Sequence, residues 1–404
     1  MQDLTRRGFL GACIGAGAAS AVASSPAVTW TDLLLTAKDR PLQHGSGILV
    51  LITLYGGNDG LNTVIPYAAS AYQDARPDLA YTADEVIKLD ADYGLNPGMR
   101  GMADMFQKGS LAVVRGVGYP EPDRSHFRSM DIWQSASLDS STTSGWIGRW
   151  LDSTGEDPLR AMHFGSVIPP LSVGDRTVGA LFAREITPSD ASTELITALA
   201  QHQQGDSPSM RMVCDSYRST ARVNRGLQPL SSEYGLSSEQ QRSGSNGLEE
   251  QLNAVAACIA ASIPTQVYSV ELGGFDTHAD ERGTQQGLLK KLDEALTGFM
   301  TQISRGKHGK NVIVMAYSEF GRRVAANASD GTDHGTAGPV FIAGDRVRGG
   351  FYGDDPSLTD LLDDDLKVTT DFRDVYHELL VQGLGSDSEV VLGSKRKAIG
   401  FLEG

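Results

Sequence analysis

The chain alternates between short, mostly apolar runs and longer amphipathic stretches. The clearest apolar runs, in chain order, are Gly47–Tyr55, Leu111–Val117, Gln266–Leu272, Val312–Ala316 and Pro339–Ala343. Runs of this length, bounded by glycine and polar residues, are typical of strands buried on both faces. The pattern therefore predicts a sheet with buried central strands.

Between these runs the apolar positions recur with a helical spacing. Helices are predicted over 98–108, from about Phe127, over 145–151, over 252–262, from about 285 to 303, and over 370–380. Strands that alternate with helices are typical of an α/β fold. In an open α/β sheet, ligands bind in the crevice beyond the carboxyl ends of the strands, so the residues that follow each apolar run are the candidates for function.

The fourth and fifth apolar runs enclose the richest polar cluster. Glu319 follows the fourth run, and a Gly-rich loop then carries Asp333 and His334 before the fifth run begins. Packing does not explain an Asp-His-Gly sequence in such a loop. The alternative for Glu319 is a structural ion pair with Arg322 or Arg323.

The third run ends in the sequence GGFDTHAD, which contains Asp276 and His278. In extended backbone, residues i and i+2 point to the same side, so both side chains can reach one ion. A carboxylate with an imidazole suits zinc and other first-row metals. The alternative is a polar surface loop with an incidental histidine.

The first run ends in GGNDG, with Asn58 and Asp59 as the polar side chains. The glycines allow a tight turn that brings these side chains to the end of the strand. We interpret both as candidate metal ligands. The alternative is a simple turn, because Asn-Asp-Gly is a good turn sequence.

The second run leads to Arg124, Ser125 and His126, just before the helix predicted near Phe127. A serine at a helix N-terminus can act as a cap. It can also act as a nucleophile or an anion contact, because the helix end offers free N–H groups and positive potential. A cap alone does not account for the arginine and histidine on either side.

We expect these clusters to converge on one site, most simply a metal site. The formal net charge of −15 over 404 residues argues against nucleic acid and anionic membranes as partners. An anionic substrate then needs positive charge from a metal ion or arginine. No stretch after the N-terminus has 18 or more apolar residues, so we expect no integral membrane segment.

The N-terminus has the features of a twin-arginine export signal. It carries the pair Arg6–Arg7, a weakly apolar Ala- and Gly-rich run, and an A-x-A cleavage sequence at Ala21–Ala23. We predict a signal peptide over 1–23, a lead-in over 24–46 and a single α/β domain over 47–404. The twin-arginine translocase is then the export partner, and the location is periplasmic or extracellular. The alternative is an N-terminal amphipathic helix.

Other features carry weaker indications. Cys214 and Cys258 form either one disulfide or two free buried thiols. A polar insertion around 203–250, rich in Ser, Gln and Gly, is interpreted as a mobile surface region. The acidic run at 360–366 is interpreted as solvated. His163, His202 and His377 are interpreted as structural or surface residues.

Seven motifs in one order resemble a known family. They are TRRGFL, GGNDGLNTVIPY, LAVVRGVGYPEPDRSHF, GGFDTH, SEFGR, GTDHGTAGPVFIAG and DFRDVY. Together they resemble the bacterial domain of unknown function 1501 family, which is grouped with the alkaline phosphatase and sulfatase superfamily. The resemblance covers about nine-tenths of the chain. It implies an alkaline-phosphatase-like three-layer α/β fold, with a mostly parallel central sheet flanked by helices and a site for one or two metal ions at the strand ends.

The superfamily pattern implies roles for individual residues. Asp59 corresponds to the metal-binding Asp of the first strand, Ser125 to the nucleophile, Asp276 and His278 to later ligands, and His334 to the final histidine. One departure concerns the adjacent Asp-His pair of the superfamily, for which this chain has Ser318-Glu319.

The sequence therefore predicts an exported metal-dependent hydrolase of phosphate or sulfate esters, with Ser125 or a metal-bound water as nucleophile. The predicted catalytic residues are Arg124, Ser125 and His126, and the predicted metal ligands are Asn58, Asp59, Asp276, His278, Glu319, Asp333 and His334. The expected cofactor is a divalent metal, zinc first, with manganese, magnesium or calcium as alternatives, and the expected partner is an anionic ester substrate. The alternative function is a catalytically degenerate exported binding or assembly protein on the same scaffold.

Overall fold

The computed structural model describes residues 27–28, 30–165, 167–182 and 247–403. The predicted signal peptide, His202, Cys214 and most of the predicted polar insertion lie outside these residues. Within them, the insertion's last residues already belong to a helix, α10, which begins at Leu248. Cys258 is a free, buried cysteine.

The central element is a mixed sheet with the strand order β1-β8-β7-β9-β2-β10-β11-β6-β12, in which β13 also pairs with β6. Its strands are β1 (Ala27–Val28), β2 (Ile48–Tyr55), β6 (Leu111–Gly118), β7 (Ala161–His163), β8 (Ala180–Phe182), β9 (Val267–Gly273), β10 (Val312–Tyr317), β11 (Gly338–Ala343), β12 (Gly350–Tyr352) and β13 (Thr370–Asp371). A three-stranded sheet comprises β3 (Val64–Ile65), β5 (Gly94–Leu95) and β4 (Ile87–Lys88).

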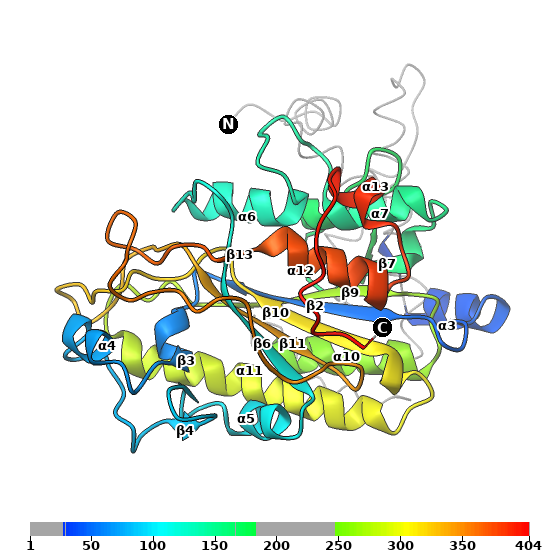
Figure 1. Ribbon diagram of the computed structural model, residues 1–404. Helices are drawn as coiled ribbons and strands as arrows, with labels where there is room; N and C mark the ends of the chain where they lie inside the picture. Colours follow the sequence, from blue (N-terminus) through cyan, green and yellow to red (C-terminus); the bar gives the residue numbers. More distant parts are fainter. Residues whose placement is uncertain (1–26, 29, 166, 183–246, 404) are drawn as a thin grey trace, which may run out of the picture.

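Helices cover both faces of the large sheet (Figure 1). On one face lie α5 (Arg100–Gln107), α10 (Leu248–Ala260) and α11 (Glu281–Ser304), and on the other lie α6 (His126–Ser135), α7 (Trp146–Ser153), α12 (Phe372–Glu378) and α13 (Ser388–Leu392). The remaining helices are α3 (Trp30–Asp39) and α4 (Ser70–Ala75), the short η1 (Gly60–Asn62), η2 (Pro158–Arg160), η3 (Pro170–Ser172) and η5 (Gly309–Asn311), and the π-helical η6 (Leu379–Gly383). The α/β/α arrangement with a mostly parallel sheet confirms the predicted fold class.

Alternate side chains of β2 explain why this strand is apolar throughout. Ile48, Val50 and Ile52 pack into the core on the α10 and α11 side, while Leu49 and Leu51 pack into the core beneath α12. Because side chains of a strand alternate between the two faces, a strand covered on both faces needs apolar residues at every position.

The sheet order brings the predicted polar clusters to one edge. β9, β2 and β10 are adjacent and parallel, so the residues that follow them emerge side by side. β11 is antiparallel to both β10 and β6, so β11 begins at the edge where β6 ends. The loops after four of the apolar runs, which form β2, β6, β9 and β10, therefore open onto the same end of the sheet, and the fifth run begins there.

Candidate metal centre

A glycine turn after β2 allows the loops at this edge to approach closely. Gly56 and Gly57 have φ values of +119° and +75°, a region that side chains other than glycine rarely adopt. A Cβ atom on Gly56 would lie 2.4 Å from the backbone nitrogen of Asp276, and one on Gly57 would lie 2.3 Å from the ring of Phe320. Only glycine leaves room here for the β9 loop and the β10 loop.

Three side chains form the centre of the cluster: His126, Asp276 and His334. Their ligand atoms all lie within 4.8 Å of one another. His126 begins α6, Asp276 follows β9, and His334 lies in the loop between β10 and β11. The fold thus joins positions that are up to about half the chain apart in sequence.

One oxygen, Oδ1 of Asp276, is shared by all the imidazoles. It lies 3.0 Å from Nε2 of His278, 3.1 Å from Nε2 of His334 and 3.5 Å from Nε2 of His126. Nε2 of His278 also lies 3.0 Å from Nε2 of His334. Four ligand-type atoms therefore surround one point.

The other ring nitrogen of each histidine has an oxygen acceptor. Nδ1 of His126 lies 2.8 Å from Oε1 of Glu319, Nδ1 of His278 lies 3.2 Å from Oδ1 of Asp333, and Nδ1 of His334 lies 2.8 Å from the carbonyl oxygen of Arg124. An acceptor at Nδ1 places the proton there and leaves the lone pair on Nε2. All three Nε2 lone pairs are consequently directed at the cluster.

This donor set fits a divalent transition metal. Nε2 of His126 is buried and has no hydrogen-bond partner among the described residues, and two Nε2 lone pairs 3.0 Å apart repel one another unless a cation lies between them. Zinc–nitrogen distances of about 2.0–2.1 Å in a tetrahedron give ligand–ligand separations of about 3.3 Å, close to those observed. Metal-binding histidines usually donate their second N–H to a carboxylate or carbonyl, as all three do here.

Glu319 supports the cluster from beneath. It is 2% exposed, and its Oε1 accepts hydrogen bonds from Nδ1 of His126 and from the backbone N–H of Gly56. Its Oε2 accepts the hydroxyl of Ser318 at 2.9 Å. The structure therefore places Glu319 behind His126, where it orients the ring, rather than at the central point.

Arg322 holds the carboxylate of Asp276 in place. This buried guanidinium donates to Oδ1 of Asp276 at 2.7 Å and to the carbonyl oxygens of Gly57, Phe275 and Thr332 at 2.7–3.0 Å. Burial raises the pKa of Asp276, but the hydrogen bond and the positive charge of Arg322 outweigh burial and lower the pKa to about 2. Asp276 is thus an anion throughout the physiological pH range.

The cluster is open to solvent on one side. The side chains of Asp276, His278 and Asp333 are 50%, 44% and 59% exposed, whereas His334 is 24% exposed. A substrate can therefore approach from this side without any movement of the described residues.

The structure does not bring Asp59 and Asn58 to the central point. Asp59 is fully buried, and both of its carboxylate oxygens bind the guanidinium of Arg76, which is also fully buried. The side-chain oxygen of Asn58 accepts Nε2 of Gln285 at 2.7 Å and the hydroxyl of Thr63 at 3.0 Å. Both residues, predicted as metal ligands, are occupied by protein partners.

Glu281 completes this second, buried cluster. Burial and the nearby charge of Asp59 raise the pKa of Glu281 to about 9, while Arg76 keeps the pKa of Asp59 below its usual value against the effect of burial. The hydroxyl of Thr332 donates to Glu281 at 2.5 Å. Because the loop with Thr332 also carries His334, this cluster fixes the position of the metal-site loop.

Ser125 and Arg124 lie at the rim, immediately before α6. Ser125 occupies the N-cap position, but its side chain makes no capping hydrogen bond, and the residue is exposed. Arg124 is 33% exposed and pairs with Asp365 at 3.2 Å. A cap therefore does not account for this serine, whose hydroxyl is available to a ligand.

The interpretation of the acidic run at 360–366 as solvated is wrong for one residue. Asp360, Asp363 and Asp364 are exposed, but Asp365 is completely buried. It accepts the backbone N–H of Leu366 at 2.8 Å in addition to the arginine. A carboxylate adjacent to two exposed aspartates can be buried because Arg124, which is distant in sequence, supplies the opposite charge.

The isolated histidines have structural partners. His163 is buried on β7, its Nδ1 lies 2.9 Å from the hydroxyl of Ser269, and burial lowers its pKa to about 4. His377 lies on α12 with Nδ1 2.6 Å from the hydroxyl of Ser388. Neither residue reaches the metal centre.

Sequence reasoning missed three residues that shape this end of the sheet: Arg76, Glu281 and Gln285. Arg76 ends α4 without a motif around it, and the predicted long helix was expected to begin only at about 285. The available signal was the i, i+4 spacing of Glu281 and Gln285, which places both side chains on one face of α11. Both are buried in the structure.

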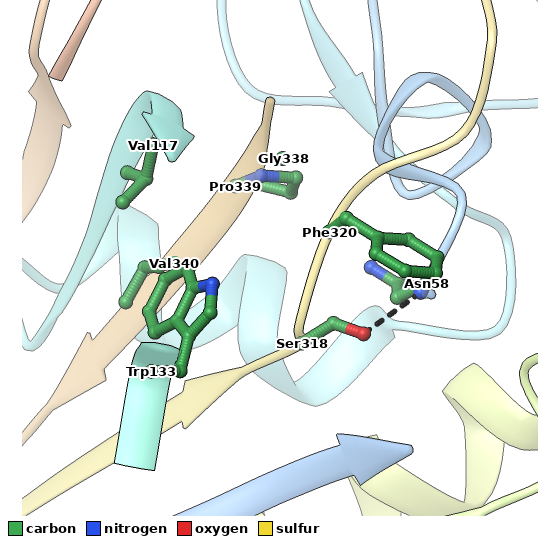
Figure 2. A pocket seen from close by; sticks show the side chains of 8 residues that line it. All are labelled: Asn58, Val117, Trp133, Ser318, Phe320, Gly338, Pro339 and Val340. Atoms are coloured by element: carbon green, nitrogen blue, oxygen red, sulfur yellow. Dashed lines mark hydrogen bonds between the residues drawn. The ribbon is translucent and has the colours of Figure 1, made fainter. Parts of the chain in front are cut away.

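A cavity of about 10 Å³ lies behind Phe320, between β6, β10 and β11 (Figure 2). It is lined by Asn58, Val117, Trp133, Ser318, Phe320, Gly338, Pro339 and Val340. The indole nitrogen of Trp133 is buried without a hydrogen-bond partner among the described residues. A cavity of this size holds about one water molecule, so it is too small for an organic ligand.

Among the described helices, none combines the length and the apolar character needed to cross a bilayer.

Several solved structures are similar to this chain at low identity. A protein in the alkaline phosphatase superfamily from Vibrio parahaemolyticus gives a TM-score of 0.38 at 10% identity over 78% of this chain and 64% of that chain, which is less than two thirds of its length. The lipoteichoic acid synthase LtaP from Listeria monocytogenes gives 0.37 at 8% identity, over 76% and 68% of the two chains. A phosphonate monoester hydrolase from Silicibacter pomeroyi gives 0.31 at 11% identity, over 87% and 77%. At these values the similarity carries no argument about the site or its chemistry.

No curated protein sequence matches the chain. A family model described as "Protein of unknown function (DUF1501)" matches residues 174–394, more than half of the chain.

Proposed function

The chain belongs to the family described as protein of unknown function (DUF1501), and we propose from its own site that it is a metal-dependent hydrolase of phosphate or sulfate esters. One observation carries this proposal. Three histidines whose Nδ1 protons are accepted by oxygens direct their Nε2 lone pairs toward one carboxylate oxygen, at an edge of the sheet that is open to solvent.

Zinc is the metal that these ligands favour. His126, Asp276 and His334 would hold it, with His278 as the adjoining fourth ligand. Imidazole and carboxylate donors suit zinc, whereas magnesium and calcium prefer sites made of oxygen alone. When bound, a divalent ion supplies positive charge that lowers the pKa of an attacking oxygen and stabilises the anionic transition state.

The residues behind the ligands keep each ring in one orientation. Glu319, Asp333 and the carbonyl of Arg124 hold the protons at Nδ1 of the three histidines. Such supporting hydrogen bonds fix both the tautomer and the direction of the ring. Their role is to present the Nε2 atoms before the metal binds.

Ser125 is the proposed nucleophile. Its hydroxyl oxygen attacks phosphorus or sulfur and gives up its proton, and the ester oxygen departs with the bonding electrons and takes up that proton, directly or through water, to give the alcohol. Water then cleaves the serine ester, which releases phosphate or sulfate and restores the hydroxyl. The position at the start of α6 favours this role, because free backbone N–H groups and the positive helix end attract an oxyanion.

The first test is the metal content of the purified protein by elemental analysis. We expect one equivalent of metal in the wild type and none in Asp276→Ala/His334→Ala. A folded wild-type protein that binds no zinc, manganese, magnesium or calcium would contradict the hydrolase.

The second test separates chemistry from binding. Zinc-loaded protein is assayed with aryl phosphates and aryl sulfates, beside Ser125→Ala. We expect Ser125→Ala to retain the metal and to lose turnover by at least about 100-fold, because the nucleophile is absent. Full activity in Ser125→Ala would exclude this serine as the nucleophile.

The alternative is a binding or assembly protein without catalysis. It is favoured by the pairing of Asp59 with Arg76, which leaves the described residues with a single cluster for metal. Stoichiometric zinc with no turnover of any aryl phosphate or sulfate would select this alternative.

Export by the twin-arginine route is part of the proposal. The support is the pair Arg6–Arg7 followed by a weakly apolar run and the A-x-A sequence at Ala21–Ala23. The protein would then act in the periplasm or outside the cell. Replacement of both arginines by lysine is expected to leave the uncleaved precursor in the cytoplasm, and normal processing of that variant would disprove the route.

A further inference from the structure

Four arginines lie at this end of the sheet: Arg76, Arg124, Arg322 and Arg323. The guanidinium groups of three of them bind other groups of the protein. Arg76 binds Asp59 and two backbone carbonyls, and Arg124 binds Asp365. Arg322 binds Asp276 and four carbonyls. These three guanidinium groups are therefore parts of the scaffold.

Arg323 is different. Its guanidinium makes no hydrogen bond and no ion pair with the residues that the structure describes, and its Nε atom is buried without a partner. Buried donors are almost always paired, and a guanidinium presents five donors in a rigid fork that matches carboxylate, phosphate or sulfate oxygens. An unused fork of this kind indicates a partner other than the residues that the structure describes.

The backbone of Arg323 is fixed on both sides. Its N–H donates to the carbonyl oxygen of Asp333 at 3.0 Å, and its carbonyl oxygen accepts Nη2 of Arg76 at 2.6 Å. The side chain is half-buried and therefore has a restricted range of positions. A fixed backbone with a free guanidinium is the arrangement of a preorganised receptor.

Backbone contacts place Arg323 beside the metal centre. Its N–H binds the carbonyl oxygen of Asp333, and the preceding residue, Arg322, forms a β-bridge with His334. Burial raises the pKa of Asp365, and the positive charge of Arg323 opposes that rise. Asp333 supports the ligand His278, and Asp365 holds Arg124 beside Ser125. Arg323 thus lies between the ligand loop and the rim that carries the nucleophile.

We propose that Arg323 is an oxyanion-binding residue of the substrate site. This inference rests on the proposed function, because it assumes that the substrate binds at the open side of the cluster. The oxyanion is either the reacting phosphate or sulfate group itself or a second anionic group next to it, such as a carboxylate on the leaving group. Both sources share the chemistry that a free guanidinium recognises.

The experiment compares Arg323→Met and Arg323→Lys with wild type and with Arg305→Gln, which alters an exposed arginine at the end of α11. Binding of inorganic phosphate and sulfate to zinc-loaded protein is measured by calorimetry, and thermal melting verifies folding. Phenyl phosphate and phenyl sulfate are then compared with their 2-carboxyphenyl counterparts in kcat and KM.

If Arg323 binds the reacting group, Arg323→Met weakens inorganic ion binding by about tenfold or more, and Arg323→Lys recovers part of the loss. If it binds a neighbouring group, inorganic ion binding is unchanged, but the lower KM of the 2-carboxyphenyl esters in wild type disappears in Arg323→Met. Unchanged values in both measurements for a folded Arg323→Met would overturn the inference.

The two proposals can fail separately. A wild type that turns over none of the esters contradicts the proposed hydrolase activity. Loss of inorganic ion binding in Arg323→Met would still support the oxyanion-binding role of Arg323. Conversely, turnover with kcat and KM identical in wild type and Arg323→Met supports the hydrolase activity and contradicts the oxyanion-binding role of Arg323.

Discussion

The role of each residue near the candidate metal centre follows from the atoms that contact it, not from its residue type. Asp59 and Asp276 both follow a buried strand and both are aspartates next to an arginine. Asp59 has both oxygens on Arg76, whereas Asp276 has one oxygen on Arg322 and the same oxygen directed at three imidazoles. The first therefore forms a structural ion pair, whereas the second has the contacts expected of the proposed metal ligand.

The support of His126 by Glu319 leads to a prediction about metal affinity. Glu319→Gln replaces a carboxylate by an amide, which is a weaker acceptor for the Nδ1 proton of His126. We expect zinc affinity to fall by about tenfold or more, the usual cost of losing such a contact, as measured by competition with a chromophoric chelator. Glu271→Gln, a half-buried glutamate on β9 away from the cluster, is the control. Equal affinities in both variants would contradict the role of Glu319.

The buried pair of Glu281 and Asp59 leads to a prediction about pH. Glu281 has an ordinary pKa of about 4.3 in an unfolded chain and about 9 in the folded protein. Between these values the folded protein binds a proton that the unfolded chain has lost, so this group's stabilisation decreases as pH rises. Urea denaturation of wild type between pH 5 and 9 should show this slope, and Glu281→Gln should reduce it. Glu294→Gln, on the exposed side of the same helix, should leave the slope unchanged.

At the scale of elements, the ends of helices and strands determine where the site residues lie. α6 begins at His126, a proposed ligand, and the loop between β10 and β11 carries His334. The turn after β2 is equally constrained, because a side chain at Gly57 would displace Phe320, whose ring lies 4.9 Å from the rings of both His126 and His334. The metal centre therefore depends on the turn geometry of a strand that contributes no ligand.

The start of α12 leads to a prediction about acid stability. Asp371 caps this helix, accepting the N–H of Arg373 at 2.9 Å, and pairs with Arg373 and Arg396. These contacts lower the pKa of Asp371 against the effect of burial. Asp371→Ala should lower the free energy of unfolding by about 1–2 kcal/mol at neutral pH, as measured by urea denaturation.

The difference in free energy of unfolding between wild type and Asp371→Ala should become smaller at acid pH. A carboxylate with a depressed folded pKa stabilises above its unfolded pKa, and the stabilisation is lost as pH falls through the folded pKa. Asp387→Ala removes the cap of α13. Asp387 has no arginine partner among the described residues, so this substitution should cost less. A gap between wild type and Asp371→Ala that stays constant from pH 7 to pH 2 would contradict the explanation.

At the scale of the whole molecule, the metal would join three distant segments. The proposed ligands come from the start of α6, the loop after β9 and the loop after β10, which meet only in the folded chain. An ion that binds the folded but not the unfolded chain stabilises the fold by mass action, by about 2.7 kcal/mol at a free concentration 100 times Kd.

This coupling leads to a prediction about melting. The Tm of the metal-free protein should rise steadily with added zinc, while Asp276→Ala/His334→Ala should show no zinc-dependent rise. Ser125→Ala should behave like wild type, because the nucleophile is not a ligand. A zinc-dependent rise of equal size in the double variant would place the ion elsewhere.

The sequence by itself determined the fold class and the neighbourhood of the site. Uninterrupted apolar runs such as Ile48–Tyr55 require burial on both faces, and a polar cluster after a strand must lie at the end of the sheet. For this reason Asp276, His278 and His334 were identifiable from their positions after or between strands.

Only the tertiary structure decided which of the polar residues meet. The order β9-β2-β10 and the antiparallel β11 bring loops from distant parts of the chain together, and no local pattern encodes that order. Asp59 forms an ion pair with Arg76, and Asp365 forms one with Arg124, because a buried carboxylate requires an opposite charge nearby. Which arginine pairs with which carboxylate depends on the distances between folded elements. The spacing of the residues along the chain does not reveal these distances.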